Sequence, residues 1–326
     1  RDSPGARIRG IGNLDRPQTR GARRARTLIA FVLFAFLPGT QADALDRPLH
    51  ILLTNDDGYR AAGIEAVHAA LQDAGFRVSV AAPRDQQSGA SMRVSIGSIN
   101  VEQIDDHAWA VDGTPADAVA WALNTVLRDD PPDLVISGAN FGQNLGGNTN
   151  LSGTVGAAIM ATHLGVPALA ISVGIDLGER SAQPERYPST AAAFPRAARF
   201  LTGLVHKLVR TAPPGGALLP PHRLLNVNYP ALPPDAIKGV RTTRVGHVGG
   251  FTAAYVADGT SGTVRIELHH GATSDADVPD GDAELFAAGF ITLSVIDASL
   301  DAGRAETAAL EQRLEGQLEA LLGAGR

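Results

Sequence analysis

The sequence predicts an α/β fold in which a mostly parallel sheet carries helices on both faces. Short apolar runs alternate with helical patterns through residues 45–239, an order typical of βαβ units. The apolar runs are rich in Val, Ile and Leu and do not alternate with polar residues, as expected of strands covered on both faces. From about residue 240 the runs are separated by Gly-rich turns, which indicates an antiparallel extension or arm on the main sheet.

Each element follows from this pattern in chain order. In the first part we expect strands at 51–54, 78–82, 108–111, 134–137, 168–173 and 224–227. Helices are expected between them at 64–74, 116–127, 155–164 and 190–208. The arm is expected to hold strands at 240–244, 253–257, 264–268 and 290–295, with no helix between them. A last amphipathic helix over 305–322 is expected to cap the fold or a partner.

Residues 1–44 have the order of a secretory signal peptide. A basic segment precedes the continuous apolar run 28–37, which is followed by Pro38-Gly39 and by an A-x-A site at 42–44. The run is too short to span a bilayer, and an uncleaved membrane anchor is the alternative. We therefore expect a periplasmic or secreted protein, or a cytoplasmic one if the leader is a misassigned start. The expected organisation is a leader at 1–44, a catalytic core at 45–239, and an arm with a C-terminal helix at 240–326 that completes the same domain.

Composition limits the function classes. The chain has 326 residues and no cysteine, which excludes thiolate catalysis, Cys-ligated zinc and disulfides. Its net charge is −6, and residues 1–44 carry eight Arg against three Asp, so the remainder has a net charge of −11. An acidic body argues against binding nucleic-acid polymers, which needs a basic surface, and nothing beyond the leader indicates a membrane. A small anionic substrate is compatible with this charge if a metal reverses the sign locally.

The apolar run 51–54 ends in two adjacent carboxylates, Asp56 and Asp57, followed by Gly58. In an open α/β sheet this places both acids at the carboxyl end of a buried strand, where ligands bind. Neighbouring carboxylates repel each other there unless a cation or hydrogen-bond donors neutralise them. A divalent metal with oxygen ligands meets this requirement, whereas an ordinary turn is the alternative, because Asn, Asp and Gly dominate turns.

Three further segments carry polar groups that suit a metal and a phosphate. Ser88 offers a hydroxyl to a metal, and Gly89 lets the backbone approach a ligand. The segment 137–148 is rich in Asn and Gly, and Asn supplies both an oxygen and an N–H donor. Ser152 or Thr154 is expected to cap the following helix, whose free N–H groups form an anion site. Each segment alone is compatible with an ordinary loop or cap, but together with the carboxylates they predict a metal site facing a phosphate site.

These stretches resemble the SurE family, the stationary-phase survival proteins that act as metal-dependent nucleoside monophosphate phosphatases. The matching motifs run in family order and include LLTNDDG (52–58), VAAPRDQQSGAS (80–91), PDLVISGANFGQNLGGNTNLSGTVGAA (132–158) and LLNVNYP (224–230). The resemblance implies a Rossmann-like three-layer α/β/α sandwich with a β-rich C-terminal arm. It also implies a homodimer or tetramer formed through that arm.

The resemblance further implies which residues form the site. One divalent ion per subunit, Mg²⁺ or Mn²⁺, is expected on Asp56, Asp57, Ser88 and Asn140. The phosphate pocket is expected to be lined by Asn144, Ser152, Gly153 and Thr154. One of the two aspartates, in the first place Asp57, is expected to assist an attacking water as a base. The implied reaction is hydrolysis of a nucleoside monophosphate to nucleoside and phosphate.

The chain departs from the family pattern at three places. Met92 stands where the family has His, and Leu151 stands where it has an aromatic residue. The C-terminal motif at 280–296 also differs, which leaves the arm geometry and the base-binding residues open.

Two other functions remain open. An exported nucleoside hydrolase also uses an N-terminal aspartate cluster, but the SGTVGAA segment at 152–158 argues against it. An exported solute-binding protein that captures an anion usually has two lobes, whereas one α/β lobe is expected here. The sequence contains no G-x-S-x-G and no H-E-x-x-H motif, so neither a serine nucleophile elbow nor that zinc motif is available.

Overall fold

Strands and helices alternate through most of the chain. The computed structural model describes residues 47–179, 187–259, 262–275, 278–299 and 303–314, all within one compact unit formed by residues 42–326. The strands are β1 (His50–Thr54), β2 (Arg77–Pro83), β3 (Val101–Asp105), β4 (Ala108–Val111), β5 (Leu134–Phe141), β6 (Ala168–Val173), β7 (Arg223–Tyr229), β8 (Val240–Thr243), β9 (Phe251–Ala257), β10 (Val264–His270) and β11 (Ile291–Asp297). The helices are α1 (Ala62–Asp73), α2 (Pro115–Asn124), α3 (Gly153–His163), α4 (Pro188–Thr211), α5 (Asp282–Ala287) and α6 (Arg304–Leu314), with the 3₁₀ helix η1 (Gly146–Leu151) before α3.

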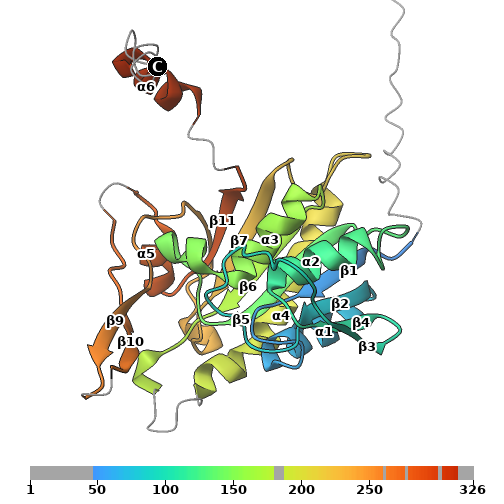
Figure 1. The fold of residues 1–326 in the computed structure, drawn as a ribbon, viewed down its shortest axis with the longest axis horizontal. Helices are drawn as coiled ribbons and strands as arrows, with labels where there is room; N and C mark the ends of the chain where they lie inside the picture. The colour runs from blue at the N-terminus through green and yellow to red at the C-terminus, as the bar shows by residue number, and fades with distance from the viewer. Residues whose placement is uncertain (1–46, 180–186, 260–261, 276–277, 300–302, 315–326) are drawn as a thin grey trace, which may run out of the picture. The chain divides into compact units, whose positions relative to one another are not determined.

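Nine strands form one sheet in the order β3-β4-β2-β1-β5-β6-β7-β11-β8 (Figure 1). The six from β4 to β7 in this order are parallel. The edge strand β3 is antiparallel to β4, and β11 is antiparallel to β7. The chain runs outward from β1 to β4 and then returns to place β5 on the other side of β1. The topological switch point therefore lies between β1 and β5, and ligands bind at the carboxyl ends of the strands at such a point.

Helices cover both faces of the sheet and produce two apolar cores (Figure 1). Along β1, Ile51 and Leu53 belong to the core that includes residues of α1 and α4, while Leu52 belongs to the core that includes residues of α2 and α3. The same alternation recurs along the neighbouring strands, because successive side chains of a strand point to opposite faces. Both faces are buried, which explains why these strands read as continuous apolar runs.

Local sequence fixes where the helices on the second face begin. Thr114 and Asp117 form a reciprocal capping box at the start of α2, and Pro115 occupies the first turn. Ser152 caps α3 by accepting a 3.0 Å hydrogen bond from the Val155 N–H. These caps place the two helix N-termini at the carboxyl edge of the sheet.

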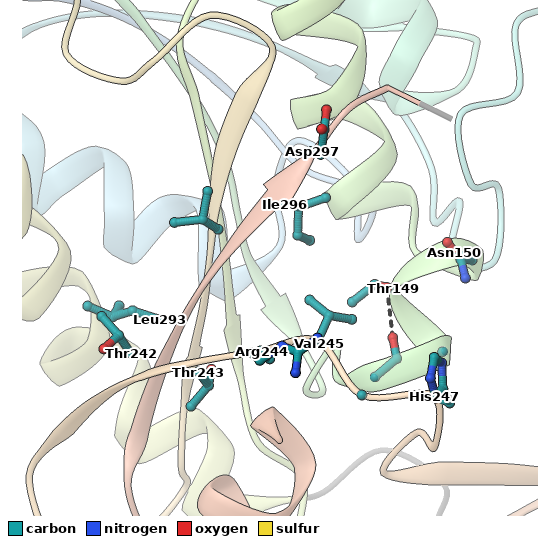
Figure 2. A pocket seen from close by; sticks show the side chains of 14 residues that line it. Thr149, Asn150, Thr242, Thr243, Arg244, Val245, His247, Leu293, Ile296 and Asp297 are labelled. Atoms are coloured by element: carbon teal, nitrogen blue, oxygen red, sulfur yellow. Dashed lines mark hydrogen bonds between the residues drawn. The ribbon is translucent and has the colours of Figure 1, made fainter. Parts of the chain in front are cut away.

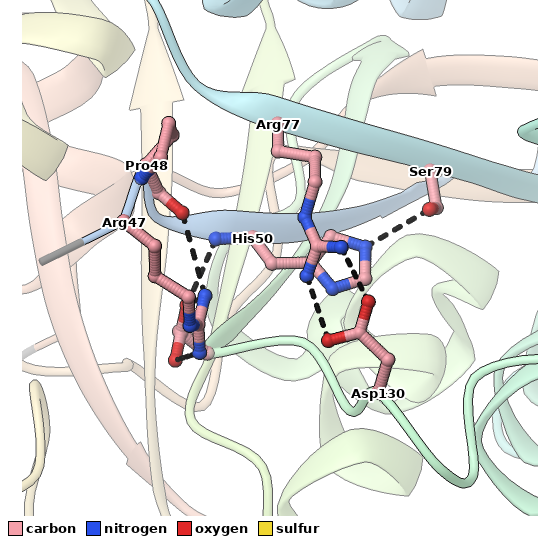
Figure 3. A network of polar contacts seen from close by, with 7 residues as sticks. Arg47, Pro48, His50, Arg77, Ser79 and Asp130 are labelled. Atoms are coloured by element: carbon pink, nitrogen blue, oxygen red, sulfur yellow. Dashed lines mark hydrogen bonds and ion pairs between the residues drawn. The ribbon is translucent and has the colours of Figure 1, made fainter. Parts of the chain in front are cut away.

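The opposite, amino edge of the sheet is held by a polar network (Figure 3). Nη1 and Nη2 of Arg47 each donate to the Asp133 carboxylate at 2.8 Å, and Asp133 also accepts the His50 N–H. The buried His50 ring contacts the Ser79 hydroxyl at 2.9 Å, and Arg77 pairs with Asp130 beside it. The network ties the chain just before β1 to the start of β5.

The predicted α/β class is confirmed, and the predicted strands and helices of the core lie within a few residues of the observed ones. Two details of the prediction were wrong: the exposed edge strand β3 was missed, and a short helix α5 interrupts the predicted all-β arm. Strand β11 extends the main sheet antiparallel to β7, as expected of an antiparallel extension, and β8 pairs parallel with β11. Only β9 and β10 form a separate antiparallel hairpin among the described strands. No residue of α6 is buried, and the predicted continuation of that helix to 322 lies outside the described residues.

The predicted leader, residues 1–44, also lies outside the described residues. In the part of the chain that the structure does describe, none of the helices combines the length and apolar character needed to cross a bilayer.

Candidate functional site

Asp56 and Asp57 lie directly beyond the end of β1, at the switch point. Asp56 is buried, with 2 % of its surface exposed, and Asp57 is partly buried. Burial of two adjacent carboxylates is unfavourable, so the contacts that each one makes determine what the site can hold.

The first turn of α3 surrounds the Asp56 carboxylate. The Thr154 hydroxyl donates a 2.5 Å hydrogen bond to Oδ1 of Asp56. Gly153 is required by the close approach, because a Cβ there would lie 2.9 Å from both Cβ and Oδ2 of Asp56. Burial raises the pKa of Asp56, and the bonds from Thr154 and the Gly153 N–H offset this effect only in part. Asp56 is thus held at a helix N-terminus, where the helix dipole favours negative charge.

Asp57 points toward β5 and the Ser88 loop. Its Oδ2 accepts the Phe141 N–H at 2.8 Å, and its Oδ1 lies 3.3 Å from Nε2 of Gln86. Burial, and next to it the charge of Asp56, raise the pKa of Asp57 to about 7, against the opposing effect of the Phe141 N–H. A carboxyl group with a pKa near neutrality gains most from a cation and is also suited to proton transfer.

Asn140 and Ser88, the other two predicted metal ligands, stand beside residues that contact Asp57. The Asn140 side chain donates through Nδ2 to the Gly142 carbonyl at 2.6 Å, while its buried Oδ1 has no hydrogen-bond partner among the described residues. The exposed Ser88 hydroxyl accepts a 2.8 Å hydrogen bond from Nε2 of Gln86, the same nitrogen that contacts Asp57. The structure thus links Ser88 to Asp57 through Gln86 and places Asn140 one residue before Phe141, whose N–H binds Asp57; the ligand role of Asp56, Asp57, Ser88 and Asn140 stays a prediction.

The remaining predicted residues are placed less uniformly. Ser152 is committed to capping α3, and Gly153 and Thr154 contact Asp56 rather than standing free. Asn144 turns toward β6, where its Nδ2 donates to the Ser172 hydroxyl at 2.9 Å. Gly89 is exposed, and a Cβ at that position would have nothing within 4 Å of it. The phosphate-binding role of these residues stays a prediction.

Two side chains of the site were not singled out from the sequence. Gln86 bridges Asp57 and Ser88 through its amide nitrogen. Asn55 donates a 2.8 Å hydrogen bond to the Gly58 carbonyl, which closes the turn that carries both aspartates. Both residues stand beside predicted ligands in the motifs, but the sequence does not show which way their side chains point.

The donor set suits a hard divalent cation. It offers two carboxylates with raised pKa values and a buried amide oxygen that lacks a partner, Asn140 Oδ1. Mg²⁺ and Mn²⁺ prefer such oxygen ligands and keep several waters. The described residues contain no group of three or more His, Asp or Glu side chains arranged to hold a metal. The predicted set has only two ionisable members, so it would not form such a group.

A cavity of about 700 Å³ lies between η1, the end of β8 with the residues after it, and β11 (Figure 2). Its walls come from η1, from the segment that follows β8 and from β11, and they carry Arg244, His247 and Asn150. None of the predicted metal or phosphate residues lines it. One wall of the cavity is η1, the 3₁₀ helix that directly precedes Ser152.

The fold and the site define a doubly wound α/β protein with an oxygen-donor cluster at its topological switch point. The family model of the survival protein SurE matches residues 51–249, which include every predicted site residue. The chain belongs to the SurE family.

Two relatives and one solved structure illustrate the similarity. A protein of Caulobacter vibrioides named 5'-nucleotidase SurE is 35% identical over 199 residues, which cover 61% of this chain and 70% of the relative. A protein of the same name from Actinobacillus pleuropneumoniae is 41% identical over 201 residues, covering 61% and 74%. The crystal structure of the SurE protein from Aquifex aeolicus superposes with a TM-score of 0.63 at 27% identity and covers 83% of this chain and 99% of that one.

Proposed function

We propose that this protein hydrolyses nucleoside monophosphates to nucleoside and phosphate with the help of one divalent cation, Mg²⁺ or Mn²⁺. The observation that carries the proposal is the unpartnered, buried Oδ1 of Asn140, one residue before the Phe141 N–H that binds Asp57, a carboxyl of raised pKa. A buried acceptor without a donor is unfavourable, and a cation bound there would satisfy it. The 5'-nucleotidase names of the relatives support the choice of substrate.

Asp56, Asp57 and Asn140 would hold the cation, with Ser88 on the exposed side of the site. When bound, the cation supplies Lewis acidity toward phosphoryl oxygens and lowers the pKa of water. Its charge also explains how an acidic protein accepts an anionic substrate.

The chain's own residues then perform two tasks. Asp57 takes the proton of the attacking water in this proposal, and its pKa of about 7, raised by burial and by Asp56, describes the carboxyl before a cation is bound. The first turn of α3 keeps Asp56 oriented through Thr154 and Gly153. In this proposal the positive end of the α3 dipole also favours the negative charge that develops in phosphoryl transfer.

Phosphate release from a panel of nucleoside monophosphates tests the proposal. Residues 45–326 are assayed with Mg²⁺, with Mn²⁺ and with excess EDTA. We expect release that EDTA abolishes and that either metal restores. Liberation of a free base without phosphate would identify a nucleoside hydrolase instead. Tight nucleotide binding without any turnover by the folded protein would favour a solute-binding role.

We also propose that the arm makes subunit contacts. On one face of the β9–β10 hairpin, Tyr255 and Ile266 lie opposite each other and are 72 % and 57 % exposed. Leu268 and Val264 extend the same apolar face, and exposed apolar patches of this kind mark interaction sites. Light scattering coupled to size exclusion tests this. We expect a dimer or tetramer for the wild type and smaller species for Ile266→Glu.

Export by the leader is a further proposal, supported by the order of the segments in residues 1–44. Expression of the full chain in a Gram-negative host, followed by fractionation, is expected to place a shortened product in the periplasm. A full-length product in the cytoplasm would contradict it.

A further inference from the structure

Residues 142–151, here called the connecting loop, join the two halves of the candidate site. The loop leaves β5 just after Asn140 and ends immediately before Ser152, the cap of α3. Its course therefore sets the distance between the Asn140 oxygen and the helix turn that holds Asp56. Two buried side chains from distant parts of the sequence, Asn228 and Asp282, hydrogen-bond to the backbone of this loop.

The first anchor is Asn228 on β7. Its Oδ1 accepts the Asn144 N–H at 2.7 Å, and its Nδ2 donates to the Asn144 carbonyl at 3.0 Å. The side chain thus pairs with the Asn144 backbone as a neighbouring strand would. Asn226 adds a 2.9 Å bond to the same carbonyl, and both asparagines are fully buried.

The second anchor is Asp282, a carboxylate with 0 % of its surface exposed. It accepts the Gly146 N–H, at 3.0 Å through Oδ2, and the Gly246 N–H, at 3.1 Å through Oδ1. Gly146 is essential there because its φ is +50° and a Cβ would lie 1.6 Å from the Val248 carbonyl oxygen. Asp282 therefore holds the connecting loop against the segment that follows β8.

A continuous series of hydrogen bonds leads from Asp282 to Asp56. Gly146, bound by Asp282, accepts the Thr149 hydroxyl through its carbonyl at 2.7 Å. The Thr149 carbonyl accepts the Ser152 N–H at 3.3 Å, and Ser152 caps the turn whose Thr154 binds Asp56. We therefore expect a shift of Gly146 to move the first turn of α3 and, with it, the Asp56 carboxylate.

We propose that Asn228 and Asp282 are positioning residues for the reaction. Neither side chain bonds a predicted metal ligand, and Asn228 meets the predicted phosphate residue Asn144 only at its backbone. They act by fixing the connecting loop, so that Asn140 and the N-terminus of α3 keep their relative positions. This inference rests on the proposed nucleotidase function. Small misplacements of catalytic groups are costly, since a shift of about 1 Å can lower the rate by about 100-fold.

Asp282→Asn is the main test, with Asp133→Asn as its matched control. The asparagine has one oxygen and one NH₂ group, and the NH₂ group cannot accept a hydrogen bond. The hydrogen bond from the N–H of either Gly146 or Gly246 is therefore lost. Asp133 also accepts a backbone N–H, from His50, but at the opposite edge of the sheet. We expect hydrogen exchange of the peptide spanning 142–151 to accelerate in Asp282→Asn and to stay at the wild-type rate in Asp133→Asn.

Activity is measured on the same samples. We expect kcat/KM for a nucleoside monophosphate to fall between about 10-fold and 100-fold in Asp282→Asn, mainly through kcat, and to stay within about twofold of wild type in Asp133→Asn. Unchanged kcat/KM despite faster exchange of the loop would overturn the proposal. An equal loss in Asp133→Asn would also overturn it, because the effect would then be one of general stability.

Asn228→Asp keeps the inference testable if Asp282→Asn does not fold. This variant keeps an acceptor for the Asn144 N–H and loses the donor to the Asn144 carbonyl. We therefore expect faster hydrogen exchange of residues 142–151 and a lower kcat/KM, as in Asp282→Asn. In the double variant the combined loss should be smaller than the sum of the single effects, because both anchors act on one loop. A wild-type protein without phosphatase activity would remove the proposed function, whereas the exchange data would still decide whether the two side chains hold the loop.

Discussion

The Thr154 hydroxyl lies 2.5 Å from Oδ1 of Asp56, although 98 residues separate them in the chain. Through this bond the first turn of α3 and the end of β1 share one buried carboxylate. Because the carboxylate is buried, its orientation depends on such donors rather than on water. The contact therefore decides where the candidate metal ligand points.

Thr154→Val tests that contact. The substitution keeps the shape of the side chain and removes the donor, so Asp56 loses a charge-assisted hydrogen bond worth about 1.5–3 kcal/mol. We expect kcat/KM for phosphate release to fall at least about tenfold. Thr154→Ser retains the hydroxyl and should keep most of the activity. Equal losses in both variants would show that packing of the methyl group, and not the hydrogen bond, is what matters.

Gly153→Ala tests the close approach of α3 to Asp56. The added Cβ would lie 2.9 Å from Cβ and Oδ2 of Asp56, so the aspartate or the helix must shift and activity should fall about 10-fold to 100-fold. Gly203→Ala in α4 is the matched control, because a Cβ there meets nothing within 4 Å. It should stabilise the protein by about 0.5–1 kcal/mol without changing kcat. Wild-type turnover in Gly153→Ala would contradict the described geometry.

Asp57→Asn is expected to raise the stability of the metal-free protein above neutral pH and to lower its activity. The pKa of Asp57 rises from a usual 3.8 to about 7 in the folded protein, so folding binds a proton and stability falls as the pH rises from about 4 to about 7. In metal-free protein at pH 8 the variant should be more stable than wild type by at most about 4 kcal/mol, given about 1.4 kcal/mol per pKa unit. Urea unfolding in EDTA measures this difference.

The same variant should lose at least about 100-fold in kcat, as expected when a general base is removed. At about pH 3, below both pKa values, Asp57 is protonated in the folded protein and largely so in the unfolded chain, so the stability gain should nearly vanish. A constant gain across this pH range would show that the carboxylate is not the source. Wild-type turnover in both Asp57→Asn and Asp56→Asn would contradict the metal assignment.

The sequence predicted the sheet and the neighbourhood of the site because both depend on local patterns. Apolar runs covered on both faces locate the central strands, Asp56 and Asp57 follow the end of β1, and Asn140 lies near the carboxyl end of β5, beyond the strand end expected at 137. The edge strand β3 was not predicted because four of its five residues are exposed and three of the five are polar, so it lacks an apolar run. Helix α5 escaped because six residues are too few to show a helical period.

The contacts that orient the site could not be predicted in the same way. Asn228 lies 84 residues from Asn144, and Asp282 lies 136 residues from Gly146. Their pairing depends on β7 and α5 reaching the connecting loop in the folded protein, which no periodicity reveals. Asn144 itself was expected at the phosphate, but its Nδ2 donates to Ser172 in the structure.

His50 gives the last prediction, on acid stability. The residue is 1 % exposed, and its ring contacts Ser79 through Nε2 and leaves Nδ1 without a partner among the described residues. Burial, followed by the charge of Arg77, lowers the pKa of His50, while Asp130 and Asp133 oppose this. The folded protein therefore resists protonation that the unfolded chain accepts.

Stability linked to His50 is complete above the unfolded pKa of about 6.5 and is lost as the pH falls below it, by about 1.4 kcal/mol per pH unit until the lowered pKa of the folded protein is reached. His50→Gln has no proton to bind, so its free energy of unfolding should fall less than that of wild type between pH 7.5 and pH 5. NMR of the wild-type imidazole should show the neutral ring persisting below pH 6.5. Identical pH slopes for the two proteins would place the acid sensitivity elsewhere, because the Arg47–Asp133 and Arg77–Asp130 pairs beside the ring are present in both.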